Sequence, residues 1–259
     1  MEHAAMGPRE RRVLGLLALA AGAAAVAVMA LVPPIAQSPG YHDFADRRTL
    51  LGVPNALDVL SNASFAAVGL LGLAVLRRHA RAVDGHARPW RVLFWGVVAV
   101  ALGSGWYHLD PTNETLVWDR LPMAVSFMAM LAALASERLG ADVGRRLLWP
   151  LVLAGAASVL WWYGTELRGA GDLRPYLLVQ IGALAAIPLL VGLVPAADGS
   201  GRDWLGALAL YAGAKVLEVG DAPIFEAIGV SGHTLKHVLA AAAIAWLVRM
   251  LGRRALAAT

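Results

Sequence analysis

The sequence predicts an all-α integral membrane protein, because it is too apolar for a water-soluble surface and its apolar residues form membrane-length runs. Of the 259 residues, 59% are hydrophobic and 15% are charged, and the mean hydropathy is +0.62. A soluble domain of this length exposes more charge. Too few polar residues remain for a second folded domain, so we expect one polytopic membrane domain.

Eight apolar runs approach the roughly 20 residues that an α-helix needs to cross the hydrocarbon core. In chain order they are 13–32, 56–76, 90–107, 116–136, 147–163, 176–194, 204–219 and 233–251. The first run follows Arg9, Arg11 and Arg12 and could be a signal peptide. It is long for that role, so we expect an uncleaved helix and eight transmembrane helices in total.

The basic residues distribute unequally between the two sides that these eight runs define. Fifteen fall in the tails and loops of one side, whereas the other side has Arg47, Arg48, Arg168 and Arg174. Because positive residues collect in cytoplasmic loops, this asymmetry places both termini in the cytoplasm. It also explains the net charge of +4, so we expect no nucleic-acid partner. The chain has no cysteine, which excludes disulfides and thiolate chemistry.

Two histidines open the last predicted helix, and a third lies at the end of an earlier one. His233 and His237, in SGHTLKH, are four residues apart and project from one helical face, so they can bind the same metal ion. His108 lies at the same predicted membrane face and is the candidate third ligand. Catalytic zinc sites often have three protein ligands and one water. Histidines at a membrane edge that simply bond water are the alternative.

Ser104 and Asp119 are the candidate catalytic residues beside these histidines. Ser104 lies one turn before His108 and could stabilise an oxyanion, or it could be a small packing residue between Gly103 and Gly105. Asp119 could move a proton or orient a histidine. Its alternative is an ion pair with a nearby basic residue.

Other polar residues are assigned structural roles or none. Lys215 and Glu218 are spaced for a salt bridge on one helix, and Lys236 is expected to extend its ammonium to the membrane interface. We assign no role to Asp221. The polar segment 166–180 could line the mouth of the site, but we interpret it as a solvated loop apart from Gln180.

The residues Ser104-x-x-x-His108, Asp119 and His233-x-x-x-His237 together resemble the pattern of the CREST membrane hydrolases. This superfamily includes the alkaline ceramidases and the progestin and adiponectin receptors. WDRLPM, at residues 118–123, is similar to a segment of the ceramidases, as is DVLSNASF at residues 58–65. The resemblance implies a seven-helix CREST-type bundle in residues 41–259. Residues 1–40 then form a cytoplasmic tail and an additional N-terminal transmembrane helix.

The predicted topology favours the ceramidase branch, whose core begins on the non-cytoplasmic side, over the receptor branch, which runs the other way. Eukaryotic alkaline ceramidases also bind calcium through an acidic N-terminal segment. The corresponding stretch here has Asp43, Asp46, Asn55 and Asp58, with Arg47 and Arg48 adjacent. Calcium is therefore possible but not supported.

The resemblance implies a zinc-dependent amidohydrolase that cleaves the N-acyl amide of ceramide or a ceramide-like lipid. Zinc would be held by His108, His233 and His237, with Asp119 as general base and Ser104 as oxyanion donor. The substrate would come from the bilayer, at the non-cytoplasmic face of a bacterial inner membrane. The alternatives are a zinc-containing receptor or sensor and a transporter, although a transporter would have polar residues at mid-membrane. The acyl lipid and the oligomeric state are not predicted.

Overall fold

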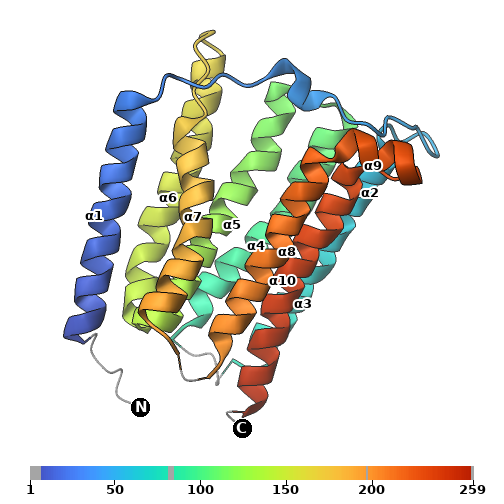
Figure 1. The fold of residues 1–259 in the computed structure, drawn as a ribbon. Coiled ribbons are helices and arrows are strands. Elements are labelled where there is room, and N and C mark those ends of the chain that lie inside the picture. The colour runs from blue at the N-terminus through green and yellow to red at the C-terminus, as the bar shows by residue number, and fades with distance from the viewer. Residues whose placement is uncertain (1–6, 81–84, 197, 258–259) are drawn as a thin grey trace. The chain divides into compact units, whose positions relative to one another are not determined.

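The computed structural model describes residues 7–80, 85–196 and 198–257, and within these ranges the protein is helical and has no β-strand (Figure 1). Residues 1–6 of the predicted tail and Arg81 of a predicted cytoplasmic loop lie outside the described residues. The elements are α1 (Pro8–Leu31), a 3₁₀ turn η1 (Pro39–His42), α2 (Ala56–Ser61), α3 (Ala63–Arg78), α4 (Ala87–Leu109), α5 (Asn113–Leu139), α6 (Ala141–Glu166), α7 (Arg174–Leu193), α8 (Ser200–Val219), α9 (Asp221–Ile228) and α10 (Gly232–Ala257).

Seven helices of the described chain are long and apolar enough to cross a membrane, with α2 and α3 counted as one span, Ala56–Arg78. The prediction of an all-α, multi-pass membrane protein is thereby confirmed at this level. One of the eight predicted spans, 204–219, is helical as part of α8 but is not among the seven. Four ionisable residues of α8, Arg202, Asp203, Lys215 and Glu218, make this helix less apolar. The count of eight and the side of the termini stay predictions.

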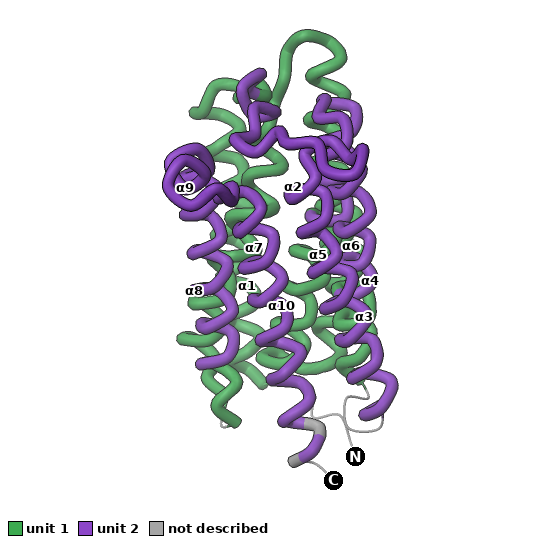
Figure 2. The backbone as a smooth tube through the Cα atoms, turned by 90° about the vertical axis from the view of Figure 1, so that its right-hand side faces the viewer, with its two compact units in different colours: residues 1–37, 84–93, 124–201 green, residues 38–83, 94–123, 202–259 purple. Residues whose placement is uncertain are grey.

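The chain divides into two compact units, coloured separately in Figure 2. Unit 1 comprises residues 1–37, 84–93 and 124–201, and within it α7 packs against α1 and α6. Unit 2 comprises residues 38–83, 94–123 and 202–259, and within it α10 packs against α2, α3 and α9. The predicted domain boundary after residue 40 stays a prediction.

Two glycines of unit 2 allow helices to approach closely. A Cβ atom on Gly103 of α4 would overlap the backbone carbonyl of Trp118 on α5. A Cβ atom on Gly232, the first residue of α10, would overlap the backbone of Leu217 and Asp221. Both positions therefore require a residue without a side chain. Gly105, by contrast, has open space around it.

The segment between α6 and α7 is built around a buried ion pair, so the interpretation of residues 166–180 as a solvated loop is wrong for its central part. In unit 1, Asp172 accepts hydrogen bonds from Arg174 Nε at 2.8 Å and Nη2 at 2.9 Å. Arg174 Nη1 also donates to the carbonyls of Met29 and Val32 at the end of α1. The guanidinium thus satisfies carbonyls that the helix leaves without partners and binds the predicted additional helix to α7.

Replacing Asp172 by asparagine should destabilise the protein by about 3 kcal/mol, because removing one partner leaves the buried Arg174 charge unpaired. Hydrogen bonds from Arg174 lower the pKa of Asp172 from 3.8 to about 2. The stabilisation is therefore complete above the ordinary pKa and is lost as the pH falls from about 4 to about 2. Thermal unfolding in detergent measures both effects.

The matched control is Asp142→Asn in α6, because Asp142 pairs with Arg145 where both side chains are exposed. An exposed pair contributes about 0–1 kcal/mol, so this variant should unfold close to the wild type. Equal losses in the two variants would contradict a structural role for the buried pair.

Candidate metal centre

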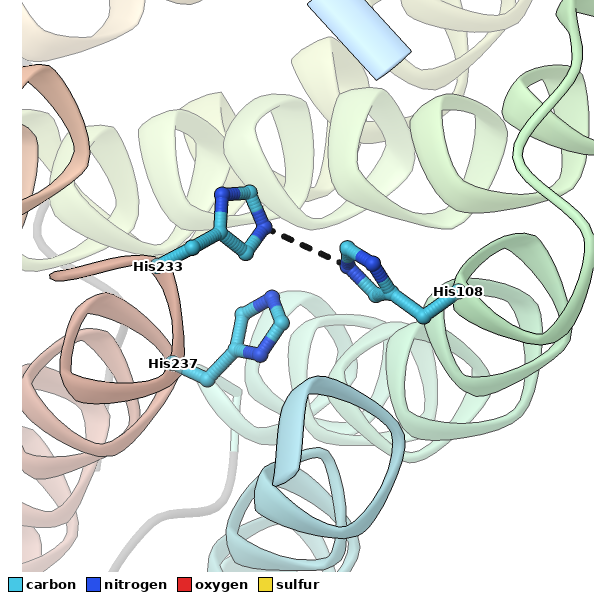
Figure 3. A group of neighbouring side chains, drawn as sticks. All are labelled: His108, His233 and His237. Carbon is cyan, nitrogen blue, oxygen red and sulfur yellow. Dashed lines mark hydrogen bonds between the residues drawn. The ribbon is translucent and has the colours of Figure 1, made fainter. Parts of the chain in front are cut away.

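Three buried histidines of unit 2 meet at the ends of two helices. His108 lies in the last turn of α4, and His233 and His237 lie in the first two turns of α10. Their exposed fractions are 1%, 5% and 2%. Each offers one ring nitrogen, and these atoms lie within 4.8 Å of one another. Figure 3 shows the three rings directed toward a common centre. The structure therefore confirms that these residues are placed to hold one metal ion.

The donor set fits zinc by composition and by spacing. Imidazole nitrogens are preferred zinc ligands, and three of them leave one tetrahedral position open. The Nε2 atoms of His108 and His233 are 3.3 Å apart. Two ligands of a tetrahedral zinc, each bonded at about 2.0–2.1 Å, are separated by about the same distance. Other metals also accept imidazole, so the group is compatible with zinc without identifying it.

A hydrogen-bonded chain fixes the ring of His237. Ser61 at the end of α2 donates its hydroxyl proton to the Asp58 carbonyl at 3.0 Å. The same hydroxyl oxygen lies 2.8 Å from His237 Nδ1 and, since its proton is used, accepts the hydrogen of that nitrogen. This places the hydrogen on Nδ1 and leaves Nε2 free as a metal ligand.

Two carboxylates fix the start of α10, which carries both of its histidines. Asp58 of α2 accepts hydroxyl hydrogen bonds from Ser231 at 2.9 Å and from Thr234 at 2.5 Å. Ser231 also accepts the backbone N–H of Thr234, as an N-cap residue does. Asp221 of α9 accepts the backbone N–H groups of His233 at 2.8 Å and of Ala45 at 2.9 Å. Asp221, to which the sequence analysis assigned no role, thus caps α10, the helix that carries His233 and His237.

Aromatic residues surround the histidines. The Phe44 ring centre lies 4.6 Å from the ring centres of both His108 and His233. Tyr107 hydrogen-bonds His42 Nδ1 at 2.9 Å, and His42 Nε2 contacts Asn113 at 3.1 Å. Sequence reasoning missed Phe44, because it lies in the irregular segment before α2, where no helical periodicity relates it to the histidines.

Ser104 and Asp119 are brought together by the close approach of α4 and α5 at Gly103. Both are buried, at 2% and 7% exposure, and the Ser104 hydroxyl lies beside the Asp119 carboxylate. Asp119 is not among the residues whose donor atoms form the histidine group. Catalytic roles for the pair stay predictions.

Lys236 enters the site, and the expectation that its ammonium extends to the membrane interface is wrong. Its side chain is 16% exposed. Its Nζ atom donates to Glu218 Oε1 at 3.0 Å and lies 3.1 Å from His233 Nε2. The predicted salt bridge between Lys215 and Glu218 is present. Glu218 therefore pairs with two lysines, one of which contacts a candidate metal ligand.

The stretch that corresponds to the calcium-binding segment of the alkaline ceramidases forms ion pairs and hydrogen bonds within the protein. Asp43 pairs with Arg47, and Asp46 accepts two hydrogen bonds from the Arg48 side chain at 2.8 and 2.6 Å. These bonds hold the pKa of Asp46 below its ordinary 3.8. Asn55 donates its side-chain N–H to the His108 carbonyl at 2.8 Å. Among the described residues, the group placed to hold a metal ion is that of the three histidines.

Fold and site define the class: an all-α protein with membrane-length helices and a buried three-histidine group that can hold a metal ion. Comparisons with known proteins identify no relative of this chain. No protein-family model, curated protein sequence or solved structure matches the chain.

Proposed function

We propose that the protein is a zinc-dependent membrane amidohydrolase that cleaves the N-acyl amide of ceramide or a ceramide-like lipid. The observation that carries the proposal is the buried His108, His233 and His237 group in the same unit as the buried Ser104 and Asp119, which lie beside each other. A metal group alone would also suit a sensor. A buried carboxylate and hydroxyl are the additional groups that hydrolysis requires.

Amide hydrolysis by these residues follows from ordinary acid–base chemistry. A zinc ion held by His108, His233 and His237 would polarise the amide carbonyl and lower the pKa of a bound water to about 7. An Asp119 carboxylate oxygen accepts a proton from the attacking water as the C–O bond forms. Asp119 then delivers that proton to the amide nitrogen as the C–N bond breaks. The products are a fatty acid and a sphingoid-type amine.

Ser104 has a distinct part in this scheme. Its hydroxyl lies beside Asp119 in the resting protein and turns its hydrogen to the carbonyl oxygen of the substrate as negative charge develops there. This motion needs rotation about one side-chain bond only. Ser104 is therefore the oxyanion donor, and its release coincides with proton uptake by Asp119.

The location of the site suits an amphipathic substrate from the bilayer. The three histidines occupy helix ends, so the amide of a lipid can reach them at headgroup depth while its chains lie among the apolar helices. We place the site at the non-cytoplasmic face of a bacterial inner membrane, because of the charge asymmetry of the loops.

The side of the membrane on which the site lies can be tested by cysteine labelling, because the chain has no native cysteine. In intact cells that express the Asp110→Cys variant, we expect a membrane-impermeant maleimide added outside to label the protein.

The function is tested with the purified, zinc-loaded protein in detergent or bilayers, by following fatty acid release from a panel of N-acyl lipids that begins with ceramides. We expect release by the wild type and none by the His233→Ala, His237→Ala double variant. If the fully loaded wild type releases no fatty acid from any of these lipids, the hydrolase assignment is wrong and a zinc-containing sensor takes its place.

A further inference from the structure

Lys236 is a buried charged residue that has no role in the proposed chemistry. It lies on α10 between the two histidines, and its ammonium contacts Glu218 and the ring of His233. A lysine near a membrane edge ordinarily lengthens its side chain toward water. Here the side chain is 16% exposed and is directed to the metal group instead.

Lys236 shares the carboxylate to which it is hydrogen-bonded with a second lysine. Glu218 has one negative charge and pairs with both Lys215 and Lys236. Lys215 is 47% exposed and can be hydrated, whereas Lys236 cannot be to the same extent. Burial of an ammonium is costly unless anionic or polar acceptors surround it. Its three N–H groups have two nearby acceptors, Glu218 and His233, so a further oxygen acceptor next to Lys236 would be favoured.

One acceptor of Lys236 is shared with the metal site. His233 Nε2 lies 3.1 Å from Lys236 Nζ and 3.3 Å from His108 Nε2. A neutral imidazole nitrogen has a single lone pair in the ring plane. When His233 uses that lone pair to bind an ion, it no longer accepts a hydrogen bond from Lys236. The ammonium then keeps Glu218 and has an N–H free beside the metal group.

From this geometry we infer that Lys236, anchored by Glu218, forms an oxyanion subsite next to the three histidines. The ligand class is an anionic oxygen that also contacts the metal position: a carboxylate, a hydroxamate or the developing oxyanion of an acyl group. The inference rests on the proposed function, because it names a second oxyanion donor for the same site. It also predicts that the fatty acid product is held by its carboxylate after cleavage.

Anion affinity of the cobalt-substituted protein tests the subsite without turnover. Acetohydroxamate is the probe, and its binding is followed by the visible absorption of the bound cobalt. A hydrogen bond between charged groups is lost in Lys236→Met, so the affinity should fall about 10- to 100-fold. Lys236→Arg, which keeps the charge, should recover part of the loss. The matched control is Lys215→Met, which removes the other partner of Glu218 and should change the affinity less than about threefold.

A double variant separates this role from simple neutralisation of Glu218. Combining Lys236→Met with Glu218→Gln removes both charges of the pair, so neither residue is left as an unpaired charge. If Lys236 only neutralised Glu218, the double variant would bind acetohydroxamate like the wild type, and that result would overturn the inference. We expect the affinity to stay low. Cobalt content, measured in every variant, shows that the metal group is intact.

The two proposals fail in different ways. Absence of fatty acid release by the wild type would refute the hydrolase function, yet a weakened hydroxamate affinity in Lys236→Met would still support the subsite. Conversely, an active wild type with unchanged affinity in a fully loaded Lys236→Met protein would remove the subsite and leave the hydrolase.

Discussion

Alanine at His108, His233 or His237 is expected to remove most of the bound metal. The wild type should purify with close to one zinc per chain, because three neutral imidazole nitrogens can be presented to one ion. Removing one of three ligands leaves an incomplete set, in which water must replace a strong donor. Elemental analysis of the purified variants measures the loss, and circular dichroism verifies that they remain helical.

The control for the metal prediction is His79→Ala. His79 follows α3 and is not part of the histidine group, so this variant should keep its zinc. The decisive protein is the His233→Ala, His237→Ala double variant. Full zinc occupancy in it would show that the metal binds elsewhere.

Asp119→Asn is expected to lose about 10²- to 10⁴-fold in the rate of fatty acid release while it keeps the fold and most of the zinc. The amide is nearly isosteric with the carboxylate and can still accept a hydrogen bond from Ser104, but it cannot take up a proton. Ser104→Ala removes one oxyanion donor and should cost about 10²- to 10³-fold. Initial rates under zinc-saturating conditions measure both.

Asp110→Asn is the matched control for Asp119→Asn, because Asp110 is an exposed acid just after α4, two residues beyond His108. It should hydrolyse lipid at the wild-type rate. An unchanged rate in Asp119→Asn would exclude Asp119 from proton transfer, whatever the result for the metal ligands.

The histidine group could be predicted from the sequence, because helical periodicity determines which residues share a helix face. The i, i+4 spacing fixes His233 and His237 on one face, and the lengths of the apolar runs place His108 at a helix end of matching depth. Ser104 follows from the same periodicity. The meeting of Ser104 with Asp119 depends on Gly103, where the lack of a side chain permits contact with the backbone near Trp118.

Lys236 and the Asp172–Arg174 pair were misread because their partners have no signature in the sequence. The expectation for Lys236 considered its distance from water, whereas its position is decided by Glu218, 18 residues earlier on another helix. Arg174 binds backbone carbonyls about 140 residues away, and every residue has such a carbonyl. The short helix α9 and its capping acid Asp221 were missed because eight residues are too few for a periodic pattern.

The placement of the histidines on two helices gives the metal a second consequence, for stability. Two of the three ligands belong to one helix, so their separation is fixed before any ion arrives, and binding needs only the end of α4 to stay against α10. His108 and His233 are 125 residues apart in the chain. In a protein without cysteine, the ion would act as a reversible cross-link that joins these distant segments. Folding free energy and metal affinity then become linked quantities, and chelation should lower the unfolding temperature in proportion to the logarithm of the free metal concentration.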